Sequence, residues 1–327
     1  MSQPTNLYRT NDAVGIREDL QDAIYSIAPY EVPFQSNIGR IRAKQTRHEW
    51  QTDDLAAVDT SNAVVEGADT SLQQSNPTVR VSNICQIMEK SVVVSGTLDA
   101  VDKAGRKAEL AYQLTKRGRE LKRDAEAIML ANQASDAASA TTARKLGGLP
   151  TWLTSNTNRA SDGADGGYST GTALTVAADD STGSGRTFTE ALLKDVLQKA
   201  WTNGGDPSIL MVGPFNKGQF SNATNFPGVA ELRSAVAQRR RATVVGAADV
   251  YLGDFGELSV VPNRFQRERD AFVLDPEYAK LATLRPLNQT KLAKTGDSEK
   301  RMMNMEVTLV VTNEAAHGVI ADLTTSA

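Results

Sequence analysis

The chain has 327 residues, of which 40% are hydrophobic and only 6% aromatic, and its formal net charge is -3. This length and hydrophobic content can supply the core of one large domain or two modest ones. So small a net charge gives no overall attraction to nucleic acid or to an anionic membrane. Any interaction that depends on charge must therefore come from a local cluster.

Simple features exclude several other classes of protein. The apolar runs at 92–94 and 209–212 are far shorter than the roughly 20 residues that span a bilayer. The first twelve residues lack the basic start and apolar core of a secretory signal. Cys85 is the only cysteine, which excludes an internal disulfide framework and a multi-thiolate metal site. We expect a soluble protein without membrane contact that folds in a reducing cytoplasm.

The N-terminal part predicts a short helix followed by an extended arm. Apolar residues recur at near-helical spacing over 11–27. Pro29 and Pro33 then stop the helix, because proline can neither continue a helix nor donate to a strand ladder. The arm has little core of its own, so we expect something else to cover it.

The next segment predicts strands separated by a long acidic excursion. Residues 80–87 alternate in part and 89–94 end in a β-branched cluster, as strands do. No lysine occurs between Gln51 and Arg80. The same stretch contains five acidic residues, which are Asp53, Asp54, Asp59, Glu66 and Asp69.

The strongest periodic pattern covers 97–133, where small and apolar residues recur every three or four positions. It predicts one helix about 55 Å long, since each residue adds about 1.5 Å. The stripe is narrow and the other positions are mostly charged, which favours contact with a sheet or a neighbouring helix over burial on all sides. Residues 134–187 are rich in Ala, Ser, Thr, Gly and Asp, which predicts surface loops anchored through Leu149, Trp152 and Leu153.

A compact unit of helices and strands is predicted next. A helix begins at a capping box formed by Thr187 and Glu190 and ends at 203–205. It is followed by a buried strand at 209–212, a helix near Lys217, a helix over 229–240 and two or three strands over 244–262. Further strands after residue 264 are predicted to pair back near the long helix, which gives an α+β fold class.

His48, with Glu49, Asp53 and Asp54 close by, has the atoms of a metal or acid/base site. The spacing is not that of H-E-x-x-H, and in a strand His48 and Glu49 point to opposite faces. A polar strand end is the favoured interpretation, and a metal-dependent hydrolase is kept as an alternative. No complete nucleotide or hydrolase motif occurs, so we predict no catalytic residue, metal or cofactor.

The strongest basic cluster comprises Arg239, Arg240 and Arg241, with Arg233 a turn or two earlier. It could neutralise phosphates, so a nucleic-acid-binding protein is the second alternative. No aromatic residues are interleaved to stack on bases, however. Contact with an acidic patch of another subunit is at least as well supported.

A distinctive set of residues occurs near both ends of the chain. The set comprises Ile27, Pro29, Glu31, Pro33-Phe34, Ile38-Gly39, His48-Glu49-Trp50, Asp53, Leu55, Met305–Leu309, Asn313-Glu314 and Ala316–Gly318. In these residues the chain resembles tailed-bacteriophage major capsid proteins with the Hong Kong 97-like (HK97-like) fold. Val32 departs from the threonine expected there, and the middle is similar mainly in the order of its elements.

The resemblance implies a division of the chain into the parts of that fold, and it implies a structural protein, not an enzyme. Those parts are the N-terminal arm at 1–47, an extended loop over a neighbouring subunit at 48–92, a peripheral domain with a spine helix at 93–135, a loop insertion at 136–187, an axial domain at 188–265 and peripheral strands at 266–327.

The implied function is self-assembly into hexamers and pentamers of an icosahedral shell that encloses double-stranded DNA without reading its sequence. The implied location is the virion, after assembly in the host cytoplasm. About 20 residues precede the arm helix, too few for a fused scaffolding domain, which implies a separate scaffolding protein or a prosegment already removed. A portal is a further implied partner, and a decoration protein is a possible one.

The loop's lack of lysine argues against a covalent lysine-to-asparagine cross-link, and we expect electrostatic contacts with the spine helix or residues 239–241 instead. We also expect replacement of Trp50 by alanine to impair assembly more than folding. The candidate contact residues are Trp50, Asp53, Asp54, Glu66, Asp69, Arg239, Arg240 and Arg241.

Overall fold

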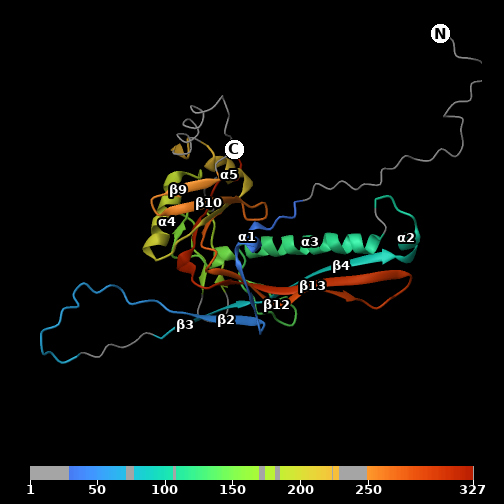
Figure 1. The fold of residues 1–327 in the computed structure, drawn as a ribbon, viewed down its shortest axis with the longest axis horizontal. Helices are drawn as coiled ribbons and strands as arrows, with labels where there is room; N and C mark the ends of the chain where they lie inside the picture. Colours follow the sequence, from blue (N-terminus) through green and yellow to red (C-terminus); the bar gives the residue numbers. More distant parts are fainter. Residues whose placement is uncertain are drawn as a thin grey trace, which may run out of the picture.

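The computed structural model describes residues 29–70, 77–105, 108–168, 174–180, 185–222, 224–227 and 249–326. Within these ranges the chain forms two main sheets, one of four strands and one of six. The six-stranded sheet lies in a rounded body, and the four-stranded sheet extends away from it beside a long helix (Figure 1). The predicted helices at 11–27 and 229–240 lie outside the described residues.

The four-stranded sheet has the order β1-β12-β13-β4. Its centre is a long antiparallel hairpin, with β13 also antiparallel to β4 and β12 parallel to β1. The predicted pairing of the last strands near the long helix is confirmed. The four strands are β1 (Gly39–Arg42), β4 (Gln86–Ser95), β12 (Ala279–Lys291) and β13 (Ser298–Val311).

The prediction of one helix over 97–133 is wrong. The chain forms a short α2 (Gly96–Ala100), leaves the helical path, and resumes as α3 (Glu109–Met129). The Nζ of Lys103 donates to three carbonyls at the end of α2, which replaces the bonds that a continuing helix would make. Gly105 has a φ of 73°, a left-handed conformation that a helix interior does not contain.

The long helix α3 packs along β4 and β13 through a narrow stripe, as its sequence pattern predicts (Figure 1). Leu121, Ala125 and Met129 are buried at four-residue intervals. They belong to the larger hydrophobic core, together with Leu149, Trp152 and Leu153. The predicted anchoring of the 134–187 loops through those last three residues is therefore confirmed.

The six-stranded sheet has the order β5-β14-β11-β8-β10-β9. It draws strands from both sides of residue 266, so the expected block of peripheral strands over 266–327 does not coincide with either sheet. Its strands are β5 (Thr157–Asn158), β8 (Ile209–Val212), β9 (Val250–Gly253), β10 (Gly256–Pro262), β11 (Ala271–Leu274) and β14 (Gly318–Ile320).

Two helices, α4 (Glu190–Thr202) and α5 (Pro214–Phe220), contribute buried side chains to the second hydrophobic core. The N-cap of α4 is Thr189 without a side-chain cap, so the predicted capping box at Thr187 is wrong. The predicted end at 203–205 is confirmed. Gly204 has a φ of 85°, and the N–H of Gly205 donates to the carbonyl of Ala200 at 2.8 Å.

Part of the N-terminal arm packs on its own chain, which corrects the expectation that something else must cover it. Proline starts the short helix α1 (Pro33–Asn37), where Phe34 is fully buried in the larger core. Strand β1 follows at once and pairs with β12. The described part of the arm thus belongs to the four-stranded sheet of the same subunit.

The carboxylate of Glu126 holds this arm against α3. It accepts the backbone N–H groups of Phe34 at 2.6 Å and Gln35 at 3.0 Å, and the Nδ2 of Asn263 at 2.8 Å. Burial raises the pKa of Glu126, while these donors act in the opposite direction. One buried side chain therefore joins the arm, the long helix and the segment that leaves β10.

The strands β2 (Arg47–Thr52) and β3 (Val79–Ile84) form an antiparallel pair, and the described residues 53–70 and 77–78 between them form no helix or strand. A smaller pair, β6 (Gly167–Tyr168) and β7 (Leu174–Thr175), lies in the loop insertion. Two 3-10 turns, η2 (Leu149–Thr151) and η3 (Glu314–Ala316), complete the described elements. No described helix is both long and apolar enough to cross a bilayer.

Replacing Glu126 with alanine should lower the free energy of unfolding by about 2–4 kcal/mol, because buried donors would lose their acceptor. Denaturant unfolding of the unassembled subunit measures this. Asp124→Ala is the matched control on the same helix; it removes a partly exposed ion pair with Lys90 and should cost about 0–1 kcal/mol. Equal losses in the two variants would contradict a central role for Glu126.

Candidate inter-subunit surfaces

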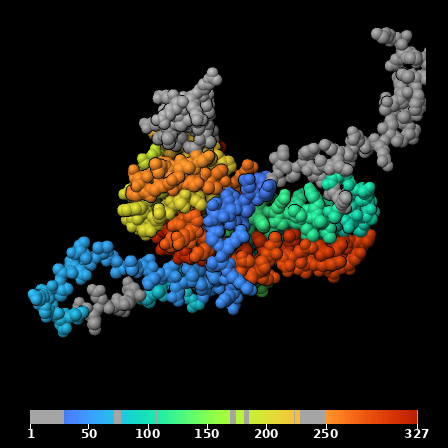
Figure 2. All heavy atoms as spheres, viewed as in Figure 1, coloured from blue at the N-terminus to red at the C-terminus, as the bar shows by residue number. Residues whose placement is uncertain are grey.

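The extended loop, whose described residues are 53–70 and 77–78, projects from the β2–β3 pair away from the rest of the molecule (Figure 2). Its described aliphatic side chains are largely in solvent: Leu55 is 99% exposed and Val58 92%, and Val64 and Val65 are also exposed. A single subunit thus leaves uncovered a set of side chains whose burial would be favourable.

The predicted acidic contact residues Asp53, Asp54, Glu66 and Asp69 all lie exposed on this same loop. Asp59 is held locally, since the N–H and hydroxyl of Ser61 both donate to its carboxylate and lower its pKa. The structure therefore brings the acidic candidates together on one projecting segment. The basic candidates Arg239, Arg240 and Arg241 lie outside the described residues, and so does Arg233.

Trp50 lies at the root of the loop and packs within its own subunit. Its ring is 5.4 Å from that of Trp152, which in turn stacks at 6.0 Å on Tyr168. Trp50 is half-buried against the larger core. Because Trp50 supports the fold directly, replacing it would alter subunit stability as well as any contact with a neighbour.

A hollow of about 660 Å³ lies beside this aromatic row. Trp152 and Tyr168 line it together with Asp54 and Glu314. The Glu314 carboxylate accepts the N–H groups of Thr154 at 3.1 Å and Ser155 at 3.2 Å. Glu314 thus fixes one wall of the hollow. The two segments that it joins are far apart in the sequence, so sequence patterns alone could not predict that they meet.

The geometry around His48 does not form a metal site. Its ring lies 6.0 Å from that of Trp50, and the adjacent Glu49 pairs with Arg80 across the β2–β3 pair. His317 is buried, and its Nδ1 accepts the N–H of Asp275 at 3.2 Å. Among the described residues, no three His, Cys, Asp or Glu side chains gather as metal ligands would. Nothing in this arrangement supports the metal-dependent hydrolase.

Cys85, the only thiol, is buried as predicted, which raises its pKa to about 11. A thiol with that pKa is protonated at neutral pH and is a poor nucleophile.

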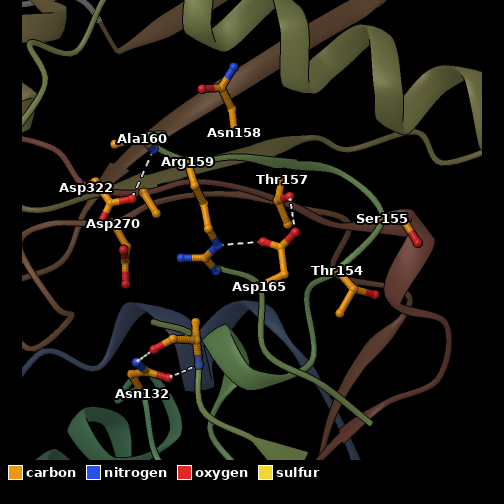
Figure 3. A network of polar contacts seen from close by, with 12 residues as sticks. Asn132, Thr154, Ser155, Thr157, Asn158, Arg159, Ala160, Asp165, Asp270 and Asp322 are labelled. Carbon is orange, nitrogen blue, oxygen red and sulfur yellow. Dashed lines mark hydrogen bonds and ion pairs between the residues drawn. The ribbon is translucent and has the colours of Figure 1, made fainter. Parts of the chain in front are cut away.

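A network of charged side chains fixes the loop insertion to the six-stranded sheet (Figure 3). Arg159 pairs with Asp165 at 2.5 Å, and the buried Asp322 accepts the N–H groups of Ala160 at 3.1 Å and Asp180 at 2.9 Å. These groups bond to one another and to the backbone. Their role is to order a segment whose composition cannot form its own core.

Asp270 is almost fully buried, and burial raises its pKa to about 6. Its carboxylate forms an ion pair with Arg267 at 3.4 Å, and Arg267 is shared because it also pairs with Asp179. Desolvation therefore outweighs attraction at this carboxyl. Sequence reasoning missed this network, since its members are scattered over more than 160 positions.

Comparison with known proteins identifies the family of the chain. The family model for the SU10 major capsid protein matches residues 3–324. The chain belongs to this family. It is also 31% identical over 354 residues to the major capsid protein of Escherichia phage Phieco32, with 98% of this chain and 97% of the relative covered.

Solved structures show the same fold at low sequence identity. The capsid of a native GTA particle superposes with a TM-score of 0.61 at 10% identity, covering 96% of this chain and 97% of that one. The phage G structure of gp27 major capsid proteins and gp26 decoration proteins gives 0.53 at 11% identity, covering 99% and 100%. The predicted HK97-like α+β fold is confirmed.

This phage major capsid protein thus belongs to a structural family, not to a family of enzymes. Its place is the virion, where capsid proteins form oligomeric shells. The functional features of the SU10-family chain are therefore surfaces, and the extended loop is the most prominent of those described.

The buried Asp270 should make stability depend on pH. Because its folded pKa of about 6 lies above the unfolded value, its favourable contribution is complete below about pH 4 and is lost as the pH rises through 6. Asp270→Asn removes this loss. Relative to wild type, its free energy of unfolding should rise by about 2 kcal/mol between pH 4 and pH 7.

Denaturant unfolding of both proteins across this pH range measures the difference. His317, whose pKa burial lowers to about 4, acts in the opposite direction, but it is present in both proteins and cancels. Asp53→Asn controls for the loss of one exposed carboxylate. A difference between Asp270→Asn and wild type that stays constant with pH would contradict the assignment.

Proposed function

We propose that this chain self-assembles into hexamers and pentamers of an icosahedral shell that encloses the double-stranded DNA of a tailed phage. The observation that carries the proposal is the extended loop, which exposes Leu55 and Val58 almost completely on a segment that its own subunit does not cover. A neighbouring subunit would bury these side chains. Closed symmetry then repeats one such contact around the whole shell.

We keep the candidate contact residues expected from the sequence, but we assign Trp50 a different role. Asp53, Asp54, Glu66 and Asp69 are exposed on the loop and are proposed to meet a basic surface of the neighbour. Each exposed pair would contribute about 0–1 kcal/mol, and repetition over the shell would make the sum large. Trp50 is proposed to set the direction of the loop, since it packs on Trp152 at the root.

We further propose a separate scaffolding protein and a portal as partners, with assembly in the host cytoplasm. A decoration protein is proposed by analogy with phage G, whose structure contains one. The enclosed DNA would be held without sequence-specific contacts. Support for all of these comes from membership of a major capsid protein family.

Electron microscopy of the purified full chain tests the proposal. Shells, capsomers or tubes are expected, with salt and co-expressed head proteins varied to find the assembly conditions. A compact monomer that persists under every condition would overturn it.

Substitution of exposed loop residues should separate assembly from folding. Leu55→Asp with Val58→Asp should leave the free energy of unfolding of the subunit within about 0.5 kcal/mol, since neither side chain is buried in the subunit. The yield of shells should fall sharply. Val176→Asp is the matched control, because Val176 is 51% exposed in the loop insertion. Normal shell yield from the double variant would contradict burial of the loop by a neighbour.

A further inference from the structure

The hollow beside the aromatic row is walled by parts of the subunit that are far apart in the sequence. The base of the extended loop contributes Asp54, the loop insertion contributes Trp152 and Tyr168, and the turn η3 contributes Glu314. Its volume of about 660 Å³ lies within the range of small-molecule sites. A whole molecule, more than a single side chain, matches a space of this size.

The walls of the hollow carry negative charge and no positive charge. Asp54 and Glu314 are the charged residues of its described lining, which contains no lysine, arginine or histidine. Glu314 accepts three neutral donors, which are the N–H groups of Thr154 and Ser155 and the hydroxyl of Ser155. These bonds orient the carboxylate but leave its charge in place. The hollow therefore attracts a cation.

Aromatic rings make one side of the hollow suitable for an organic cation. The rings of Trp152 and Tyr168 stack at 6.0 Å with an interplanar angle of 13°. Aromatic faces attract ammonium and guanidinium groups, and they also cover the aliphatic stems that carry such groups. A hydrated metal ion would gain little from these rings, and no described group of three His, Cys, Asp or Glu residues could hold one.

Trp152 supplies an independent indication of a ligand. The residue lines the hollow and is only 3% exposed, and its indole Nε1 has no hydrogen-bond partner among the described residues. A buried donor without an acceptor is costly, and native structures rarely keep one. A carbonyl oxygen on the ligand would supply this acceptor. A simple alkylamine would not.

We propose that this hollow binds a small organic cation that also carries a carbonyl group, the chemistry of a basic amino acid amide. The cationic group lies at the carboxylates of Asp54 and Glu314, the aliphatic stem against Tyr168, and the carbonyl at the Nε1 of Trp152. One subunit forms the whole described lining, so the site does not depend on the assembly proposed above. A bound ligand would join the base of the extended loop to η3.

Two other occupants match the hollow less well. A nucleic-acid phosphate carries the same sign of charge as the walls and would be repelled. A basic side chain of a neighbouring subunit has the right charge, but it fills only part of the volume. It also brings no carbonyl to Trp152 unless its main chain enters the hollow.

Calorimetric titration of the unassembled full chain with L-argininamide, at constant ionic strength, tests the site. We expect a Kd of about 1 mM. L-citrullinamide replaces the guanidinium with a neutral urea, and agmatine lacks the carboxamide, so each should bind about tenfold more weakly. No binding, equal binding of all three compounds, or tighter binding of Mg²⁺ or Ca²⁺ would overturn the proposal.

Substitutions locate the binding within the subunit. Asp54→Asn should weaken argininamide binding about tenfold, and it should leave folding unchanged because Asp54 is exposed. Asp53→Asn is the matched control, since Asp53 is an adjacent exposed carboxylate outside the described lining. Its Kd should stay within about twofold of wild type. Equal losses in the two variants would show only a general attraction to the loop and would overturn the site.

Trp152→Phe tests the indole separately, because it keeps an aromatic ring and removes the N–H donor. Argininamide and agmatine should then bind equally, whereas wild type prefers argininamide. A preference that persists in Trp152→Phe would contradict the assignment of the carbonyl to Nε1.

Titration of assembled particles separates a free ligand from a residue of a neighbouring chain. A free ligand should bind particles and subunits with Kd values within about threefold of each other. Binding to subunits but not to particles would mean that a neighbour fills the hollow, which would overturn the assignment to a free molecule. If the wild-type chain never assembles, the proposed function fails, and the titration of subunits still decides this proposal.

Discussion

The buried carboxylate of Glu126 determines how the main parts of this subunit meet. It lies on α3, which packs against the four-stranded sheet, and it binds the arm helix through two backbone N–H groups. The same carboxylate accepts a bond from Asn263, directly after β10 of the six-stranded sheet. A buried charge is tolerated only where donors surround it. The relative position of arm, helix and sheets is thereby restricted to arrangements that deliver those donors.

Local patterns predicted the elements whose stability is local. The strand at 209–212, the glycine-rich end of α4 and the narrow stripe of α3 follow from periodicity and capping chemistry. The break between α2 and α3 was missed because the apolar stripe continues across it. It depends on Lys103 bonding to the carbonyls of the preceding turn and on one glycine conformation. The hydrophobic pattern fits one continuous helix and two separate helices equally well, so these bonds decide which of the two forms.

Features that depend on long-range contacts were beyond the reach of sequence reasoning. The sequence predicts an arm without packing partners in its own subunit, because those partners, α3 and β12, are far away in the sequence. The six-stranded sheet gathers β5, β11 and β14 from three separate regions. The acidic part of the candidate surface was predicted, since its charges lie on one continuous segment. The charges that remain unpaired on α3 could not be predicted, because a sequence does not show that Glu120 and Asp124 already pair with Arg117 and Lys90.

The subunit buries charge and exposes apolar side chains in places where a monomeric protein would do the reverse. Asp322 and Asp270 are buried in the network that orders the loop insertion, whereas Leu55 and Val58 stand in solvent on the extended loop. An exposed apolar loop can associate with copies of itself. The five acidic residues on the same loop oppose this, because two loops side by side would bring like charges together. The same charges favour a basic partner, so a surface with bases and apolar side chains is selected over another loop. Weak individual pairs suit this role, since a subunit placed wrongly can leave before the shell closes around it.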